Sequence, residues 1–413
     1  MPLRLLLVPL YRQRMMPLLV VLQIALACAI LANVLFLLYQ QAAPMLIPDG
    51  VVRGELLLVD QVISRNGSWK ESEIRAGTEA LRALPGVRVA APAVGLPMKQ
   101  SLTMTYSLKS PDGAVTATGF SGDHLIDALG LKLVAGQDFS ADDYHAMDLA
   151  NATGIADQTA TPVILTAALA RKLFPAGNPI GQLVRDPDDA TAGGFRVVGV
   201  VEHLLRNQLD ELGDGKAEDS ILLPSRITGT PILTYAVRTD PQRRQALRKE
   251  IADTLQRQFG SLQMEGIPIQ VDDYETLRTD AFKPRRAAVW LLGTVSAVVT
   301  LITFVGIASL TGYWIEQRTR QIGIRRALGA TRAQILHHFQ LENLLVAGAG
   351  VLLGLPLALA ANQLLMRYYE LPRLPWQWLP AGALALLLLG QVAVLWPARR
   401  AAGVAPAIAT RSA

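Results

Sequence analysis

The chain has 413 residues, of which 51% are hydrophobic and 18% are charged, and these proportions are unusual for a soluble protein. The net charge is +5, but residues 41–284 carry 24 basic and 31 acidic side chains, while the remaining residues carry 15 basic and 3 acidic ones. The excess of basic charge therefore flanks the most apolar parts of the chain, as the positive-inside rule predicts for membrane proteins. Basic residues are not interleaved with aromatic residues, so we expect no nucleic-acid partner.

The first apolar segment is long enough to cross a membrane. We expect a cytoplasmic segment at 1–16 and a membrane span at 17–39, because about 20 apolar residues cross the hydrocarbon core of a bilayer. Cys28, the only cysteine, lies in this span. A lipidated cysteine after a signal peptide is one interpretation, but the apolar run continues to Leu38 and is too long for a signal peptide. We therefore interpret Cys28 as a packing residue, and a single cysteine excludes an internal disulfide and a cysteine-based metal site.

Residues 40–286 lack long apolar runs and mix strand-like with helix-like periods. This mixture predicts one large α+β domain with split βαβ units. Residues 138–161 are acidic and poor in large apolar side chains, so we expect a surface loop there. Helices are predicted at 70–84 and 241–259, and strands at 51–59, 87–94, 114–120, 195–201, 220–223, 233–238 and 267–271.

Three further apolar segments follow the large domain. They predict spans at 287–313, 339–368 and 379–396, with a cytoplasmic loop at 314–338, a short outer loop at 369–378 and a tail at 397–413. Basic clusters precede the first span, occupy the loop at 314–338 and follow the last span. All three are cytoplasmic only if both termini are cytoplasmic. The predicted fold class is therefore membrane α-helical, with four transmembrane helices and the α+β domain outside, between spans one and two.

One basic cluster disagrees with this orientation. Lys283, Arg285 and Arg286 fall on the outer side of the second span. Three independent clusters outweigh this one, so the orientation with cytoplasmic termini stands as the prediction.

The loop between the second and third spans has the most informative composition. Charged positions alternate with small and aliphatic ones, which predicts a short amphipathic helix between two membrane spans. Such a helix suggests a docking element for a cytoplasmic partner, while anchoring to anionic lipid headgroups is the alternative. The candidate docking residues are Glu316, Arg318, Arg320, Gly323, Arg325, Arg326 and Gly329. Arginine forms bidentate contacts with carboxylates, and the two glycines permit close backbone approach or end the helix.

Small and polar residues inside the spans predict helix packing. Gly350 and Gly354 form a Gly-x-x-x-Gly face, which fits either a contact with another protomer or packing inside one subunit. Amides such as Gln23 and Asn33 are expected to hydrogen-bond across helix interfaces. Glu342 is costly to bury, but it lies near the cytoplasmic end of its span, where it could meet loop arginines.

No catalytic or metal site is visible in the sequence. The nearest P-loop look-alike, Gly215-Lys216, is followed by Ala217 where Ser or Thr is required. His337 and His338 are adjacent, and neighbours in a helix do not face the same way, so we expect no metal site there. ATP hydrolysis is therefore expected on another chain.

Several motifs together carry a family resemblance. The loop reads Glu316-x-Arg-x-Arg-x-Ile-Gly-Ile-Arg-Arg-Ala-Leu-Gly-Ala-Thr331, and the ending reads Trp396-Pro-Ala-Arg-Arg-Ala-Ala-Gly-Val-Ala-Pro406. The segments at 162–165, 172–174, 179–182 and 195–201 are similar to the MacB-type periplasmic core domain. With the order of one span, a large outer domain and three spans, the chain resembles MacB/FtsX-type (type VII, mechanotransmission) permeases of ABC transporters.

The resemblance implies a non-catalytic permease subunit in a bacterial inner membrane. A separate ABC ATPase, which holds ATP and Mg, would contact the loop helix and drive motion of the periplasmic domain. The expected partners are that ATPase, a second permease protomer in a homodimer or heterodimer, membrane lipid and a periplasmic adaptor protein for efflux. The alternatives are lipoprotein extraction in the manner of LolC and LolE, or FtsX-like regulation of a periplasmic hydrolase.

Overall fold

The computed structural model describes residues 15–149, 160–185, 187, 194–208, 212, 215–369 and 373–402. The contacts divide the chain into two compact units. The helical unit comprises residues 1–42 and 285–413, and the α/β unit comprises residues 43–284. The inserted domain was predicted at 40–286, between the first two spans.

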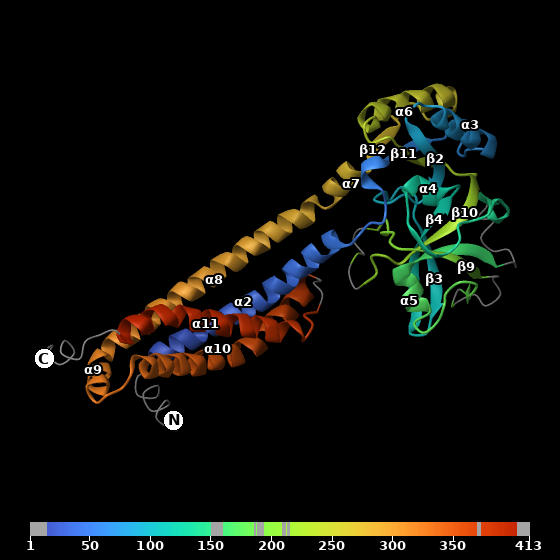
Figure 1. Cartoon of the computed structure of the whole chain (residues 1–413). Helices are drawn as coiled ribbons and strands as arrows, with labels where there is room; N and C mark the ends of the chain where they lie inside the picture. Colours follow the sequence, from blue (N-terminus) through green and yellow to red (C-terminus); the bar gives the residue numbers. More distant parts are fainter. Residues whose placement is uncertain are drawn as a thin grey trace. The chain divides into compact units, whose positions relative to one another are not determined.

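Among the residues that the structure describes, four helices are long and apolar enough to cross a membrane (Figure 1). They are α2 (Met15–Leu46), α8 (Lys283–Gln317), α10 (Arg332–Tyr369) and α11 (Trp378–Ala402), and the short helix α9 (Thr319–Ala327) lies between α8 and α10 in the chain. Each long helix extends beyond the predicted span, because hydropathy marks only the apolar part of a helix. The predicted fold class, four membrane helices with a large mixed domain between the first and second, is confirmed.

Amide side chains link the helices of the helical unit. Gln23 Nε2 donates to the carbonyl of Ile302 on α8 at 3.2 Å. Asn33 Nδ2 donates to the carbonyl of Ala358 on α10 at 3.0 Å, and also to Ala29 in its own helix. These bonds confirm the expected role of Gln23 and Asn33. The same role was expected of Asn343 and Gln391, but in the described residues Asn343 Nδ2 and Gln391 Nε2 are buried without a hydrogen-bond partner. Cys28 is fully buried in the same helix, as expected for a packing residue.

The α/β unit is built on one sheet of 12 strands. The main path runs β12-β1-β11-β2-β4-β10-β7-β9-β5, and β3, β6 and β8 pair at its sides. The strands are β1 (Leu56–Ile63), β2 (Val87–Val94), β3 (Met104–Ser110), β4 (Gly113–Gly122), β5 (Leu133–Gly136), β6 (His145–Asp148), β7 (Thr161–Thr166), β8 (Leu183–Val184), β9 (Phe195–Val201), β10 (Ser220–Thr228), β11 (Ile232–Thr239) and β12 (Gln270–Asp273). The helices are α3 (Glu71–Arg82), α4 (Leu125–Leu129), α5 (Ala167–Leu173), α6 (Arg244–Phe259) and α7 (Tyr274–Ala281).

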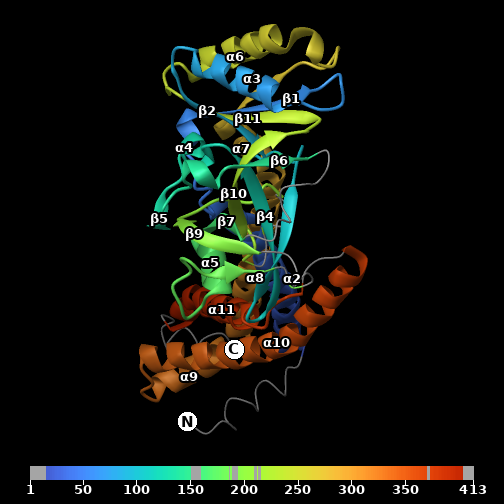
Figure 2. The ribbon, with the colours of Figure 1, turned by 90° about the vertical axis from the view of Figure 1, so that its right-hand side faces the viewer.

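One end of the sheet contains the predicted split βαβ units. The strand β11 lies between β1 and β2, which α3 connects, and β1 lies between β11 and β12, which α6 connects. Figure 2 shows α3 and α6 side by side. They cover a core in which Trp69 stacks on Phe259 at a centroid distance of 4.6 Å, and Trp69 Nε1 donates to the carbonyl of Val62. Gly77 permits this packing, because a Cβ there would lie 2.5 Å from Phe259.

Several local predictions were displaced or missed. The first strand begins at Leu56 rather than at 51, because Arg53–Glu55 form a 3-10 turn. The strand β3 and the helix α5 were not predicted. The predicted loop at 138–161 contains the strand β6, which pairs with β10 in parallel, while residues 150–159 of that loop lie outside the described residues. Short edge strands of this kind are set by their partner strand rather than by local periodicity.

A buried carboxylate, that of Asp49, contacts residues near both the start and the end of the α/β unit. Asp49 is 4% exposed and accepts hydrogen bonds from Arg53 Nε at 2.8 Å and from Tyr274 Oη at 3.1 Å. Arg278 Nε lies 2.9 Å from the same carboxylate. Arg278 Nη2 also donates to the carbonyls of Met45 and Ile47 near the end of α2. The last turn of α2 is therefore fixed to α7 within this unit.

Candidate functional site

The candidate site consists of α9 and the first turns of α10. The helix α8 ends at Gln317, and Arg318 occupies the turn before α9 begins at Thr319. The N–H of Arg318 donates to the carbonyl of Ile315, and its carbonyl accepts from the N–H of Ile322. These bonds satisfy backbone groups on both sides of the turn, so the chain changes direction there without losing its hydrogen bonds.

The end of α9 carries the stop signal that the sequence predicted. Gly329 has a φ of 97°, a left-handed conformation that residues with side chains rarely adopt. The N–H of Ala330 donates to the carbonyl of Arg325 at 3.1 Å, as in a Schellman motif. Thr331 and Gln334 then form a reciprocal capping box that starts α10. These features determine where α10 starts relative to α9.

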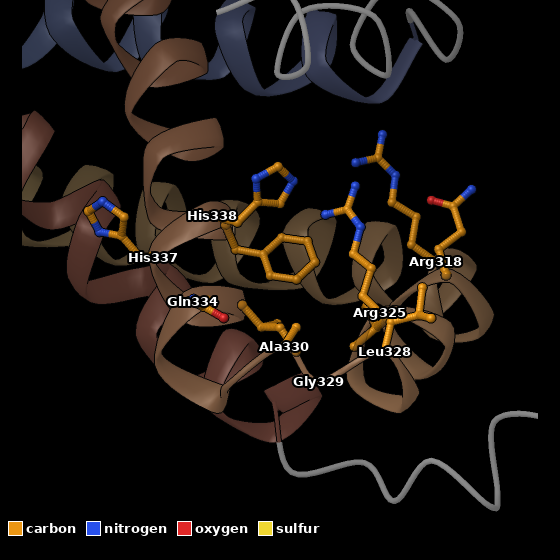
Figure 3. Close-up of a pocket in the computed structure, with 12 residues that line it drawn as sticks. Arg318, Arg325, Leu328, Gly329, Ala330, Gln334, His337 and His338 are labelled. Carbon is orange, nitrogen blue, oxygen red and sulfur yellow. The ribbon is translucent and has the colours of Figure 1, made fainter. Parts of the chain in front are cut away.

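A groove of about 650 Å³ lies between α9 and the start of α10. In Figure 3, the side chain of Arg318 extends from the turn before α9 and that of Arg325 from α9, and the ring of His338 on α10 faces them, whereas His337 points away. The other lining residues are Gln321, Ile322, Leu328, Gly329, Ala330, Gln334, Ile335 and Phe339. The groove therefore combines apolar walls with guanidinium groups, which suits a partner segment with apolar and acidic side chains.

The predicted docking residues differ in their exposure. Glu316, Arg320 and Arg325 are exposed, whereas Gly323 is buried. Two apolar side chains on α9 are also exposed, Ile324 at 47% and Leu328 at 83%. The side chain of Arg326 lies outside the described residues. The exposed surface of α9 is thus both cationic and apolar.

Arg318 differs from the other arginines because its side chain is only 11% exposed. Its Nη1 donates to Glu342 Oε1 at 2.9 Å, and Glu342 is 1% exposed on α10. The guanidinium carbon of Arg318 lies 4.4 Å from the centroid of the Trp314 ring, on the other side of the turn. The sequence pointed to a contact between Glu342 and a loop arginine, but it gave no sign of the role of Trp314.

Gly350 and Gly354 lie against α2 of the same chain. A Cβ on Gly350 would lie 2.8 Å from Cβ of Ile24, and a Cβ on Gly354 would lie 2.5 Å from Cβ of Cys28. The two glycines therefore bring the α10 backbone close to α2. Of the two possibilities that the sequence left open, this geometry matches packing inside one subunit.

The described residues contain no group of three or more His, Cys, Asp or Glu side chains that could hold a metal ion. The polar chemistry of the groove is therefore that of arginine, glutamine and histidine side chains.

Comparisons with known proteins match both units. Residues 20–254 match the MacB-like periplasmic core domain family, and residues 293–406 match the FtsX-like permease C-terminal family. The macrolide export ATP-binding/permease protein MacB of Azoarcus sp. (strain BH72) is 28% identical over 346 residues, which cover 81% of this chain and 47% of that protein. The uncharacterized ABC transporter permease YknZ of Bacillus subtilis (strain 168) is 24% identical over 76% of this chain and 73% of that protein.

A solved structure, the periplasmic region of MacB from Actinobacillus actinomycetemcomitans, aligns with 56% of this chain and 96% of that region, at 16% identity and a TM-score of 0.36. The aligned part of this chain spans about half the length of the MacB relative. The first family match covers more than half of the chain, and the described residues include four membrane-length helices. The chain therefore belongs to the family of membrane permeases with a MacB-like periplasmic core domain and an FtsX-like permease C-terminal region.

Proposed function

We propose that this chain is the permease subunit of an ABC transporter, and that a separate ATPase chain docks at the groove between α9 and α10. The observation that carries the proposal is the exposed, arginine-bearing helix α9 between two membrane-length helices. The exposed arginines and the exposed Leu328 suit a protein partner that presents acidic and apolar side chains. ATP and Mg would bind on the partner, and this chain would be non-catalytic.

The proposed mechanism is the transmission of motion. ATP-driven closure of the partner would push α9, and the helices continuous with the turn at Arg318 and the cap at Thr331 would carry the displacement. The α/β unit would then act on a substrate or partner outside the cytoplasm. In this arrangement the chain lies in a bacterial inner membrane with both termini in the cytoplasm, and a second permease protomer completes the transporter.

We further propose that the transporter works in efflux together with a periplasmic adaptor protein. The support comes from the names of relatives, which include macrolide export and pyoverdine export ATP-binding/permease proteins. YknZ, named as a permease, supports the placement of the ATPase on a separate chain.

The docking proposal is tested by reversing two exposed charges on α9. We expect Arg320→Glu combined with Arg325→Glu to abolish co-purification of the ATPase, because two cations of the docking surface become anions facing an acidic partner. Membrane insertion should be unchanged, since neither side chain is buried. The measurement is the amount of ATPase retained on the tagged permease, relative to the permease recovered from membranes.

The matched control makes two charge reversals of the same kind near the C-terminal end of α10. Arg367 and Arg373 are also exposed, and the predicted orientation puts them on the outer side of the membrane. The variant with Arg367→Glu and Arg373→Glu should retain the ATPase. Full ATPase retention by the α9 variant would refute docking at α9.

A further inference from the structure

We propose that Arg318 and Glu342 form a positioning pair that fixes the angle of α9 against α10, and that Arg318, which lines the inner side of the groove, acts through this pair rather than as one of the exposed docking arginines. This inference deepens the proposed function, because α9 is the element on which the ATPase would push. It divides the loop arginines into two groups: Arg318, which holds α9 in place, and the exposed arginines, which contact the ATPase.

The position of Arg318 in the chain explains how its contact with Glu342 can fix α9. Arg318 lies in the turn between α8 and α9, and its partner Glu342 lies 24 residues later, inside α10. One side chain thus joins the turn to a helix that the chain reaches only after α9 is complete. The stacking of the Arg318 guanidinium on Trp314 adds a contact to the last part of α8. The guanidinium of Arg318 therefore contacts both α8 and α10, and α9 begins at the next residue.

Because the two side chains are largely shielded from water, separating them is energetically costly. Glu342 is 1% exposed and Arg318 is 11% exposed, so water does not screen their interaction as it does at a surface. A buried ion deprived of its partner is strongly unfavourable, because its desolvation is no longer compensated. Rotation of α9 away from α10 would separate these charges. The pair therefore holds α9 at one angle without occupying its exposed face.

Some polar atoms near the pair lack a hydrogen-bond partner within the described part of the chain. Among the described residues, Glu342 Oε2, Trp314 Nε1 and His338 Nδ1 are buried without a hydrogen-bond partner. His338 lies four residues before Glu342, on the same face of α10, and Arg325 faces it from α9. The contact of the Glu342 carboxylate with Arg318 is therefore not backed by a second donor among the described residues, and loss of Arg318 would leave this buried charge uncompensated.

The test is amide hydrogen exchange of the full chain in lipid nanodiscs, followed by mass spectrometry in the absence of any ATPase. We expect Glu342→Gln and Arg318→Gln each to accelerate exchange at residues 319–327 by at least about tenfold, since loss of one partner of a buried pair exceeds the ~1.4 kcal/mol that a tenfold change represents. Arg320→Gln, on the exposed face of the same helix, should leave this exchange unchanged. Arg318→Lys should give an intermediate effect, because it keeps the charge and loses the planar stack on Trp314.

A charge swap distinguishes a pair from two separate structural residues. The double variant Arg318→Glu with Glu342→Arg should recover most of the protection of α9, as a double-mutant cycle requires for directly coupled groups. Wild-type exchange in Glu342→Gln, or a swap as labile as the single variants, would overturn the inference. Because no ATPase is present, either result leaves the docking proposal to be judged by the co-purification experiment alone.

Discussion

The two units of this protein bury polar groups in different ways. In the α/β unit, both carboxylate oxygens of Asp49 are engaged by Arg53, and one of them also by Tyr274 and Arg278. In the helical unit, Glu342 has one oxygen paired with Arg318, and its other oxygen has no partner among the described residues. Both oxygens of Asp49 therefore have partners, whereas only one oxygen of Glu342 has a partner among the described residues.

This difference follows from what surrounds each carboxylate. The partners of Asp49 come from two short segments, the 3-10 turn that contains Arg53 and the helix α7 that contains Tyr274 and Arg278. The helical unit is instead held by close backbone contact at glycines and by amides that bond to carbonyls. A carboxylate with several partners keeps a compensating contact when one partner is lost, whereas a carboxylate with one partner depends on that partner alone. The protein thus combines a carboxylate with several partners in the α/β unit with one that depends on Arg318 in the helical unit.

The largest effect is expected at the network around Asp49. Asp49→Asn should lower the free energy of unfolding of the α/β unit by about 3–5 kcal/mol, because it removes a buried carboxylate and leaves the partly buried guanidinium of Arg278 uncompensated. Pulse proteolysis of the full chain in urea would measure this change. Glu265→Gln is the control, since Glu265 forms an exposed pair with Arg65 and should cost under about 1 kcal/mol. Equal effects of the two substitutions would contradict the special role of Asp49.

The next effect tests glycine packing in the helical unit. Gly354→Val should destabilise this unit by about 1–3 kcal/mol, because its Cβ would lie 2.5 Å from Cβ of Cys28 and 2.9 Å from the carbonyl of Ala25. The measurement is the thermal unfolding midpoint of the protein in detergent. Gly348→Val provides the control for the helix propensity of valine, since no heavy atom lies within 4 Å of a Cβ at that position. A shift of the same size in both variants would exclude close packing on α2 as the cause.

The smallest effect concerns a partly exposed acid and its pH dependence. The hydrogen bond from Arg238 Nε, at 2.6 Å, holds the pKa of Glu55 below its ordinary value of 4.5, and Arg88 contributes as well. A carboxylate with a lowered pKa stabilises the folded state above its ordinary pKa, and this stabilisation is lost as the pH falls through its folded value. Glu55→Gln should therefore cost under about 1 kcal/mol at pH 7, and the difference should shrink below pH 4.5. Urea unfolding of the wild type and the variant at pH 7 and at a pH below 4.5 would check this prediction. The same difference in the free energy of unfolding at both pH values would contradict it.

Much of the architecture could be predicted from the sequence. Apolar length located the four membrane helices, and the strands at 87–94 and 195–201 were placed at the bounds that the structure has. Gly329 marked the end of α9, because a left-handed residue after a helix is a local requirement. Strands such as β3 and β6 were missed, because their stability comes from partner strands rather than from their own periodicity.

The sequence by itself determined the four apolar helices, the inserted domain and a short arginine-rich helix between two of the spans, since periodicity, hydropathy and glycine placement are properties of neighbouring residues. Only the tertiary structure decided that Arg318 is buried against Glu342 while Arg320 and Arg325 are exposed. It also decided that Gly350 and Gly354 face α2 of the same chain. Both outcomes depend on which helix packs against which, and contacts across 24 residues or between separate helices leave no pattern in the local sequence.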